Sequence, residues 1–146
     1  MREYLFKAKP VSDSDYYFFS QIWNNNCKDG FVYGSLVVDV EKNYYICVSA
    51  MRNTKTYMNN GITSMIKVSP QTVCQFTGSL DKNGKKIFEN DIVSRNVIPM
   101  LVKYDDDYSS FFAEYDLDGE IYKNIILGSD MLEVIGNIHD NPELIS

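Results

Sequence analysis

The side chains best suited to chemistry are carboxylates that cluster in the last third of the chain. The candidate binding residues among them are Asp105, Asp106, Asp107, Asp116 and Asp118. Clustered carboxylates bind Ca²⁺ in an EF-hand loop, which places Gly at position 6 and a bidentate Glu at position 12. With Gly119 at position 6, position 12 falls on Ile125, so the bidentate ligand is missing. We therefore predict neither a metal site nor a cofactor, and we keep these acids as candidates for binding a partner.

A single histidine, His139, excludes every catalytic or metal-binding arrangement that needs a pair of imidazoles. Cys27, Cys47 and Cys74 form no C-x-x-C pair, and an odd number of cysteines does not suit a disulfide framework. Cys47 and Cys74 lie in apolar runs, where a free cysteine packs as a small hydrophobic residue. Phosphate-binding glycine loops and the G-x-S-x-G motif are also missing. We predict that the protein is not an enzyme and has no catalytic residues.

The formal net charge of −6 is the sum of two unlike parts of the 146-residue chain. Residues 1–103 carry thirteen basic and nine acidic side chains, whereas residues 104–146 carry eleven acids and one base, Lys123. The two parts therefore have net charges of +4 and −10. Opposite charge on two parts of one chain favours head-to-tail self-association. The acidic part also carries the charge of a nucleic-acid mimic.

The stretch from Arg52 to Lys103 has a basic excess, with eight basic and three acidic side chains. Its candidate binding residues are Lys82, Lys85, Lys86 and Arg95. Small β-barrels bind nucleic acid through such mixtures of cationic and aromatic side chains. The excess is modest for a phosphate binder, and lysines beside a hairpin also keep a sheet edge from aggregating. Nucleic-acid binding is therefore an alternative that we do not favour.

These candidates have to be positioned by strands, because β-branched and aromatic residues recur in short runs separated by Gly, Asn, Asp and Ser. We predict strands over residues 4–8, 31–40, 44–48, 62–68, 73–76, 86–88, 91–94, 100–104, 111–115, 120–127 and 132–138. Residues 12–22 form either a short helix opened by an N-cap or an aromatic loop that packs on a sheet. Residues 52–61 are polar and rich in Asn, which indicates a long connection between strands.

The clearest turn signal is Asn83-Gly84, two residues that tolerate positive φ, placed between apolar flanks. A second signal is Asp116-Leu117-Asp118-Gly119. From residue 86 onward the chain therefore consists of short strands joined by hairpin turns, which suffices to close a small barrel.

Three segments carry a resemblance to a known family: MREYLFKA at residues 1–8, QFTGSLDKNGKKIFENDIV at residues 75–93 and LEVIGNIHDNPEL at residues 132–144. In this order they are similar to the start, the signature segment and the end of the YopX-like family of phage and prophage proteins. The resemblance implies a mostly β fold with an SH3-like barrel in the C-terminal half. It also implies a phage origin and a place in the cytoplasm of the bacterial host, and it brings no catalytic residues.

The chain departs from the family pattern at Asn90, where the family usually has Gly. Asn is the non-glycine residue that best tolerates left-handed backbone, so we expect the turn to survive the change. Gly136 lies inside an apolar run, which predicts a β-bulge or a close backbone approach in the last strand.

Together these patterns predict a mainly β fold, with an N-terminal irregular β region over residues 1–78 and a C-terminal SH3-like small barrel over residues 79–146, packed as one structural unit. The predicted function is that of a phage or prophage accessory protein, a non-enzymatic protein-interaction module whose partner is a second copy or a host protein. The alternatives are nucleic-acid binding through residues 52–103 and mimicry of nucleic acid by residues 104–146. No apolar run approaches the ~20 residues that span a bilayer, so we expect no membrane contact.

Overall fold

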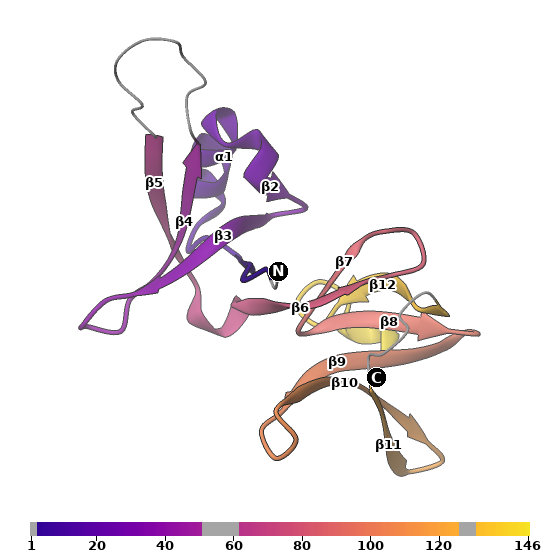
Figure 1. Cartoon of the computed structure of the whole chain (residues 1–146). Helices are drawn as coiled ribbons and strands as arrows, with labels where there is room; N and C mark the ends of the chain where they lie inside the picture. Colours follow the sequence, from indigo (N-terminus) through magenta and orange to yellow (C-terminus); the bar gives the residue numbers. More distant parts are fainter. Residues whose placement is uncertain (1–2, 51–61, 126–130) are drawn as a thin grey trace. The chain divides into compact units, whose positions relative to one another are not determined.

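The computed structural model describes residues 3–50, 62–125 and 131–146, and the chain divides into two compact units (Figure 1). Tyr4–Val73 is the N-terminal unit, and Cys74–Ser146 together with Glu3 is the C-terminal unit. Antiparallel strands dominate both units, so the prediction of a mainly β fold is confirmed. The predicted boundary after residue 78 falls inside the first strand of the C-terminal unit. The predicted connection over residues 52–61 lies outside the described residues.

The described part of the N-terminal unit contains an antiparallel sheet. Its strands are β1 (Phe6–Ala8), β2 (Cys27–Lys28), β3 (Phe31–Val38), β4 (Tyr44–Ala50) and β5 (Ile62–Val68). Hydrogen bonds join them in the order β5-β4-β3-β1, and β2 pairs with β3. β3 ends before the predicted residue 40, because the Asp39 carboxylate accepts the main-chain N–H groups of Glu41 and Asn43 and closes the turn.

Two structures were predicted for residues 12–22, a helix or an aromatic loop. The segment forms the helix α1 (Asp13–Ile22), so the prediction of a loop is wrong. Ser12 is the N-cap and accepts the main-chain N–H of Asp15 at 3.2 Å. Phe19 stacks on Trp23 just beyond the helix, with ring centroids 6.4 Å apart. The core of the N-terminal unit consists of Ala8, Trp23, Val32, Ile46, Val48, Ile66 and Val68.

The C-terminal unit begins with a hairpin of β6 (Cys74–Leu80) and β7 (Lys86–Phe88), followed by a five-stranded antiparallel sheet. The strands of that sheet are β8 (Asp91–Arg95), β9 (Ile98–Asp105), β10 (Ser110–Leu117), β11 (Glu120–Ile125) and β12 (Glu133–Asn137). Their order is β11-β10-β9-β8-β12. No pairing among the described residues joins β11 to β12, and the SH3-like barrel stays a prediction.

One face of this sheet packs on the core of the C-terminal unit. That core consists of Ile87, Val93, Met100, Val102, Ala113 and Leu132. Because side chains alternate across a strand, Ala113 and Tyr115 of β10 point to the core, whereas Glu114 and Asp116 belong to the opposite face. Two carboxylates therefore lie on the face of β10 opposite this core, which they share with the buried Phe112.

The turn between β6 and β7 forms where the clearest turn signal predicts it. Gly84 has a φ of +80°, which glycine adopts without strain. Asn83 does not share a positive φ, so only the second residue of the pair uses left-handed backbone. The reason is the loop length: the main-chain N–H of Asp81 donates to the carbonyl of Lys85 at 2.7 Å, which encloses a loop that needs a single left-handed position.

Two further local expectations concern the turn before β8 and the last strand. Asn90 has a φ of +68°, so it holds the left-handed turn as predicted. The pairing of β12 with β8 shifts register between Val134 and Gly136, which is the predicted bulge. A Cβ atom added to Gly136 would lie 2.6 Å from Oδ1 of Asn141, so the predicted close approach is confirmed as well.

Candidate functional site

The face of β9, β10 and β11 that points away from the core carries both charged and apolar side chains. Glu114 of β10 lies opposite Leu101 of β9 and Lys123 of β11. Asp116 lies opposite Ile121 of β11. Directly opposed residues of an antiparallel pair share one face, so aliphatic groups flank both carboxylates.

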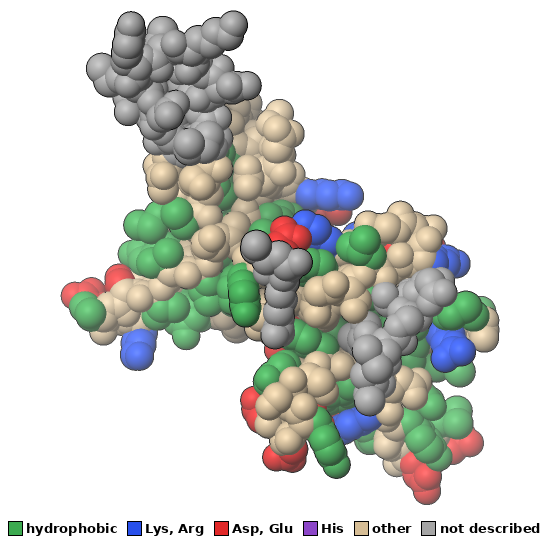
Figure 2. Space-filling view, in the orientation of Figure 1, with side chains coloured by type: hydrophobic (Ala, Val, Ile, Leu, Met, Phe, Trp, Pro, Cys, Tyr) green, Lys and Arg blue, Asp and Glu red, His purple; other side chains and the backbone are tan. Residues whose placement is uncertain are grey.

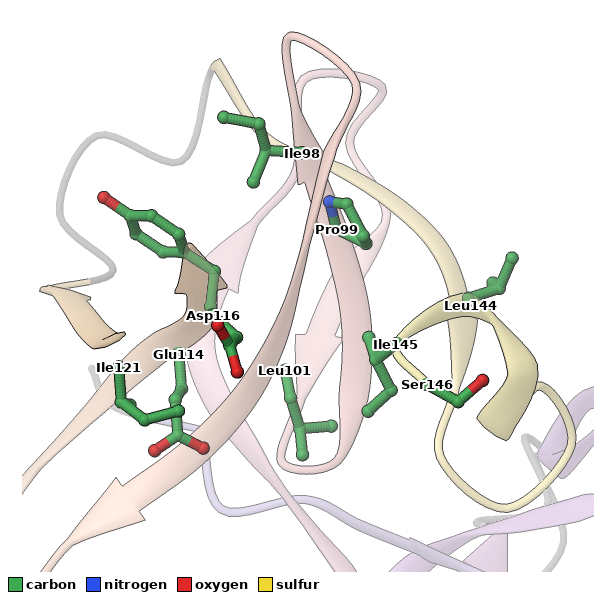
Figure 3. Close-up of a pocket in the computed structure, with 10 residues that line it drawn as sticks. Ile98, Pro99, Leu101, Glu114, Asp116, Ile121, Leu144, Ile145 and Ser146 are labelled. Atoms are coloured by element: carbon green, nitrogen blue, oxygen red, sulfur yellow. The ribbon is translucent and has the colours of Figure 1, made fainter. Parts of the chain in front are cut away.

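A cavity of about 490 Å³, which we call the sheet pocket, opens beside this face (Figure 3). Its aliphatic lining comes from two strands, β9 and β11, and from the last residues of the described chain: Ile98, Leu101, Ile121, Leu144 and Ile145. Glu114 and Asp116 are its two charged lining residues among the described side chains. In Figure 3 these carboxylates lie on the β10 side, across from Leu144 and Ile145. The sheet pocket is thus apolar on one side and acidic on the other.

The two carboxylates of the sheet pocket differ in their partners. Oε2 of Glu114 lies 2.9 Å from Nζ of Lys103, which forms an ion pair. Oδ1 of Asp116 accepts the main-chain N–H of Gly119 at 2.8 Å, a bond that holds the turn between β10 and β11. Among the described residues, no cation pairs with Asp116. The uncompensated charge of the pocket is therefore that of Asp116.

The second lysine of this face is also engaged within the unit. Nζ of Lys123 lies 3.4 Å from Oδ2 of Asp105 and 4.6 Å from the ring centroid of Phe112. Partial burial raises the pKa of Asp105, but the main-chain N–H groups of Asp107 and Tyr108 and the Lys123 charge outweigh it. The pKa of Asp105 consequently lies below its ordinary value, and Asp105 is ionised at neutral pH.

The structure separates the sequence-predicted acids into two groups at opposite ends of β10 (Figure 2). Asp105, Asp106 and Asp107 belong to the turn between β9 and β10, where Asp105 holds the turn. Asp116 and Asp118 flank the turn between β10 and β11, and Asp118 has a φ of +54°. Of the five, only Asp116 lines the sheet pocket. A joint binding role for all of them stays a prediction.

The sequence-predicted basic residues do not converge on the sheet pocket. Lys82 pairs with Glu133 at 3.2 Å. Lys86 pairs with Glu3 at 3.1 Å and also lies 5.4 Å from the ring centroid of Phe76. Two other predicted residues are exposed: Lys85 in the β6–β7 turn and Arg95 at the end of β8.

The stretch from Arg52 to Lys103 is divided between the two units. Lys67 belongs to the N-terminal unit, whereas the basic residues from Lys82 onward belong to the C-terminal unit. Arg52 and Lys55 lie outside the described residues. Nucleic-acid binding by this stretch stays a prediction.

The single histidine meets a cysteine, a juxtaposition that the sequence did not indicate. Nε2 of His139 lies 3.8 Å from Sγ of Cys74, and Nδ2 of Asn90 donates to the same sulfur at 3.8 Å. Cys74 is fully buried, so its thiol is closed to a substrate in solution. Across residues 3–50, 62–125 and 131–146, no three His, Cys, Asp or Glu side chains gather as a metal-binding group.

Sequence reasoning identified Asp116 but missed the apolar half of the sheet pocket. Strand register places Leu101 and Ile121 in the pocket lining. The 3₁₀ turn Pro142–Leu144 brings Leu144 and Ile145 to the same pocket. The usable signal is the aliphatic pair Leu144-Ile145, which begins two residues after Pro142 in a segment otherwise polar. Register between β9, β10 and β11 has no comparable local signal.

The comparisons with known proteins give one family. A sequence model described as YopX protein matches residues 22–146. Among solved structures, the crystal structure of protein EF1440 from Enterococcus faecalis is similar, with 20% sequence identity, coverage of 100% of each chain and a TM-score of 0.46. No curated protein matches the chain. In the described part of the chain, no helix has the length and apolar character needed to cross a membrane.

Proposed function

The chain belongs to the YopX protein family, and on that premise we propose that it is a non-enzymatic protein-interaction module. In this proposal it is a phage or prophage accessory protein that works in the cytoplasm of the bacterial host. Its partner is another protein, either a host protein or a second copy of the chain.

The observation that carries the proposal is the sheet pocket of the C-terminal unit. Its volume of about 490 Å³ is within the usual range of binding cavities. Aliphatic walls with a few placed polar groups suit the side chains of a peptide segment, because the apolar part gives affinity and the polar part gives orientation. The pocket opens beside an exposed sheet face, where a partner segment has access.

The burial of Cys74, the cysteine in contact with His139, supports a non-enzymatic role. A thiol beside an imidazole is one arrangement that could supply a nucleophile and its base. Cys74 has no solvent exposure, and a nucleophile has to reach its substrate. The pair therefore gives no support to hydrolysis or acyl transfer.

The nucleic-acid alternatives have less support from the charges. Lys82, Lys86 and Lys103 are each engaged with an acid of the same unit, which reduces what they offer to phosphate. A mimic of nucleic acid requires a continuous row of negative charge, but the candidate acids lie in two groups at opposite ends of β10: Asp105, Asp106 and Asp107 at one end, Asp116 and Asp118 at the other. We therefore favour a protein partner.

Capture from a bacterial host lysate tests this proposal with matched variants. Ile121 lines the sheet pocket and is 57% exposed, while Leu117 is 51% exposed on β10 and does not line it. The proposal predicts proteins that are captured by the wild type and by Leu117→Ser but are lost with Ile121→Ser. Capture that Ile121→Ser leaves unchanged, or that nuclease treatment of the lysate abolishes, contradicts it.

Sedimentation velocity in low and 0.5 M salt separates the two kinds of partner. Self-association through the oppositely charged parts of the chain predicts an oligomer that salt dissociates. A monomer under both conditions removes the second copy as the partner and leaves the host protein.

A further inference from the structure

We propose that the sheet pocket selects a partner segment with a cationic side chain beside an aliphatic one, and that Asp116 is the carboxylate that pairs with the cation. This inference rests on the proposed function, because it names the chemistry of the partner at the same site.

The charge inventory of the pocket leaves one negative group for a partner. Glu114 and Asp116 are its two acidic lining residues in the described chain, and Lys103 neutralises Glu114 at 2.9 Å. The other lysine of the face, Lys123, pairs with Asp105 instead. A cation that enters the pocket therefore meets Asp116 without having to displace a lysine.

Asp116 is held in position before a partner arrives. Its Oδ1 accepts the main-chain N–H of Gly119 at 2.8 Å, and this bond fixes the carboxylate at the turn between β10 and β11. Among the described residues, Oδ2 of Asp116 has no hydrogen bond. A carboxylate that is already oriented loses little side-chain entropy on pairing, so the ion pair contributes more than one between two mobile groups.

The apolar wall suits the stem of a long cationic side chain. Lys and Arg cover apolar surface with their methylene groups while the charged end remains near water. Leu144 and Ile145 lie across from Asp116, so a stem can pack on them while the charge reaches the β10 side (Figure 3). An acidic side chain at the same place would be repelled by Asp116. The pocket thus discriminates by charge within an apolar setting.

The test uses the full chain labelled with ¹⁵N and three short probes: acetyl-Leu-Arg-Leu-amide, the same peptide with citrulline, and the same peptide with glutamate. Citrulline has nearly the shape of arginine without its charge. We expect the arginine peptide to shift the amide signals of Leu101 and Ile121 and to bind about two- to fivefold more tightly than the citrulline peptide. The glutamate peptide should bind more weakly than both.

Two variants separate a local ion pair from a general effect of charge. Asp116→Asn removes the charge but keeps an oxygen that accepts the Gly119 N–H. Asp118→Asn is the control, because it removes an equal charge from a residue that does not line the pocket. The inference predicts that Asp116→Asn reduces arginine-peptide affinity to the citrulline value, while Asp118→Asn leaves it unchanged. Equal binding of the arginine and citrulline peptides, or equal effects of the two variants, overturns it.

The peptide experiment distinguishes a failure of the charge selection from a failure of the proposed function. Equal binding of arginine and citrulline peptides with shifts at Leu101 and Ile121 overturns the charge selection and leaves the pocket as a binding site. No binding of any probe overturns the inference as well, and the lysate experiment with Ile121→Ser then decides the proposed function by itself.

Discussion

The Asp81 carboxylate is hydrogen-bonded to Val134, a residue of the last strand: Oδ2 of Asp81 accepts the main-chain N–H of Val134 at 3.0 Å. Oδ1 of the same group accepts the N–H groups of Asn83 at 2.8 Å and Lys85 at 2.9 Å. Asp81 is only 6% exposed. One buried side chain therefore holds the β6–β7 turn and attaches it to β12.

Replacement of Asp81 by alanine should destabilise the C-terminal unit strongly. It leaves three main-chain N–H groups without their acceptor, and we expect the free energy of unfolding to fall by about 3 kcal/mol. Urea denaturation measures the loss. Asp107→Ala removes an exposed carboxylate and should change the value by less than about 0.5 kcal/mol. A loss in Asp81→Ala as small as that of Asp107→Ala contradicts the assigned role.

Replacement of Glu89 by glutamine should stabilise the protein at neutral pH. Burial raises the pKa of Glu89, and nearby Asp106 raises it further, although a main-chain hydrogen bond with Gln75 lowers it. Because the folded-state pKa exceeds the unfolded one, stability is lost as the pH rises from about 4 through the folded-state pKa of Glu89. Denaturation at pH 7 should show Glu89→Gln to be more stable than the wild type, with no difference at about pH 3. A gain that does not depend on pH contradicts the titration of Glu89 as its cause.

The left-handed turn at Asn90 should accept glycine better than alanine. Asn90 has a φ of +68°, where an alanine costs about 1 kcal/mol more than asparagine or glycine. Asn90→Gly relieves backbone strain but loses the contact with Cys74, so we expect a stability close to that of the wild type. Thermal unfolding of both variants measures the difference. Equal stability of Asn90→Ala and Asn90→Gly would mean that backbone conformation does not limit this position.

Gly136 and Asn141 should be coupled in a double-mutant cycle. The Cβ of Gly136→Ala would lie 2.6 Å from Oδ1 and 3.0 Å from Cβ of Asn141, so we expect a loss of about 1 to 3 kcal/mol. Asn141→Gly removes the atoms that clash and should recover a large part of that loss in the double variant. Strict additivity of the two free-energy changes contradicts the close approach.

Two turns and one β-bulge were predictable because their causes are local. Gly84, Asn90 and Gly136 each occupy a backbone position that few residue types tolerate, and the types themselves are visible in the sequence. The end of β3 was missed because the apolar residues continue to Val40, which hides the turn that Asp39 closes with its side chain. β2 was missed because Cys27–Lys28 is too short for any period to appear.

The sheet pocket was predictable only at Asp116, because counting charges finds acids but not their neighbours. Strand register places Glu114 beside Lys103, and turn geometry directs the Asp105 carboxylate to the main chain of its own turn. Composition encodes neither relationship. Leu101, Ile121 and Leu144 come from distant parts of the sequence and meet only in the folded unit. A site built across strands in this way has no local signature.

The central claim is that the sheet pocket is the surface that binds a protein partner, and methyl NMR tests it most directly. The full chain, labelled at Ile and Leu methyl groups, is titrated with the partner captured from the host lysate. We predict shifts at Ile98, Leu101, Ile121, Leu144 and Ile145, with none at Ile22, which is 76% exposed on α1. Shifts at Ile22 with all five pocket methyl groups unchanged would contradict the claim.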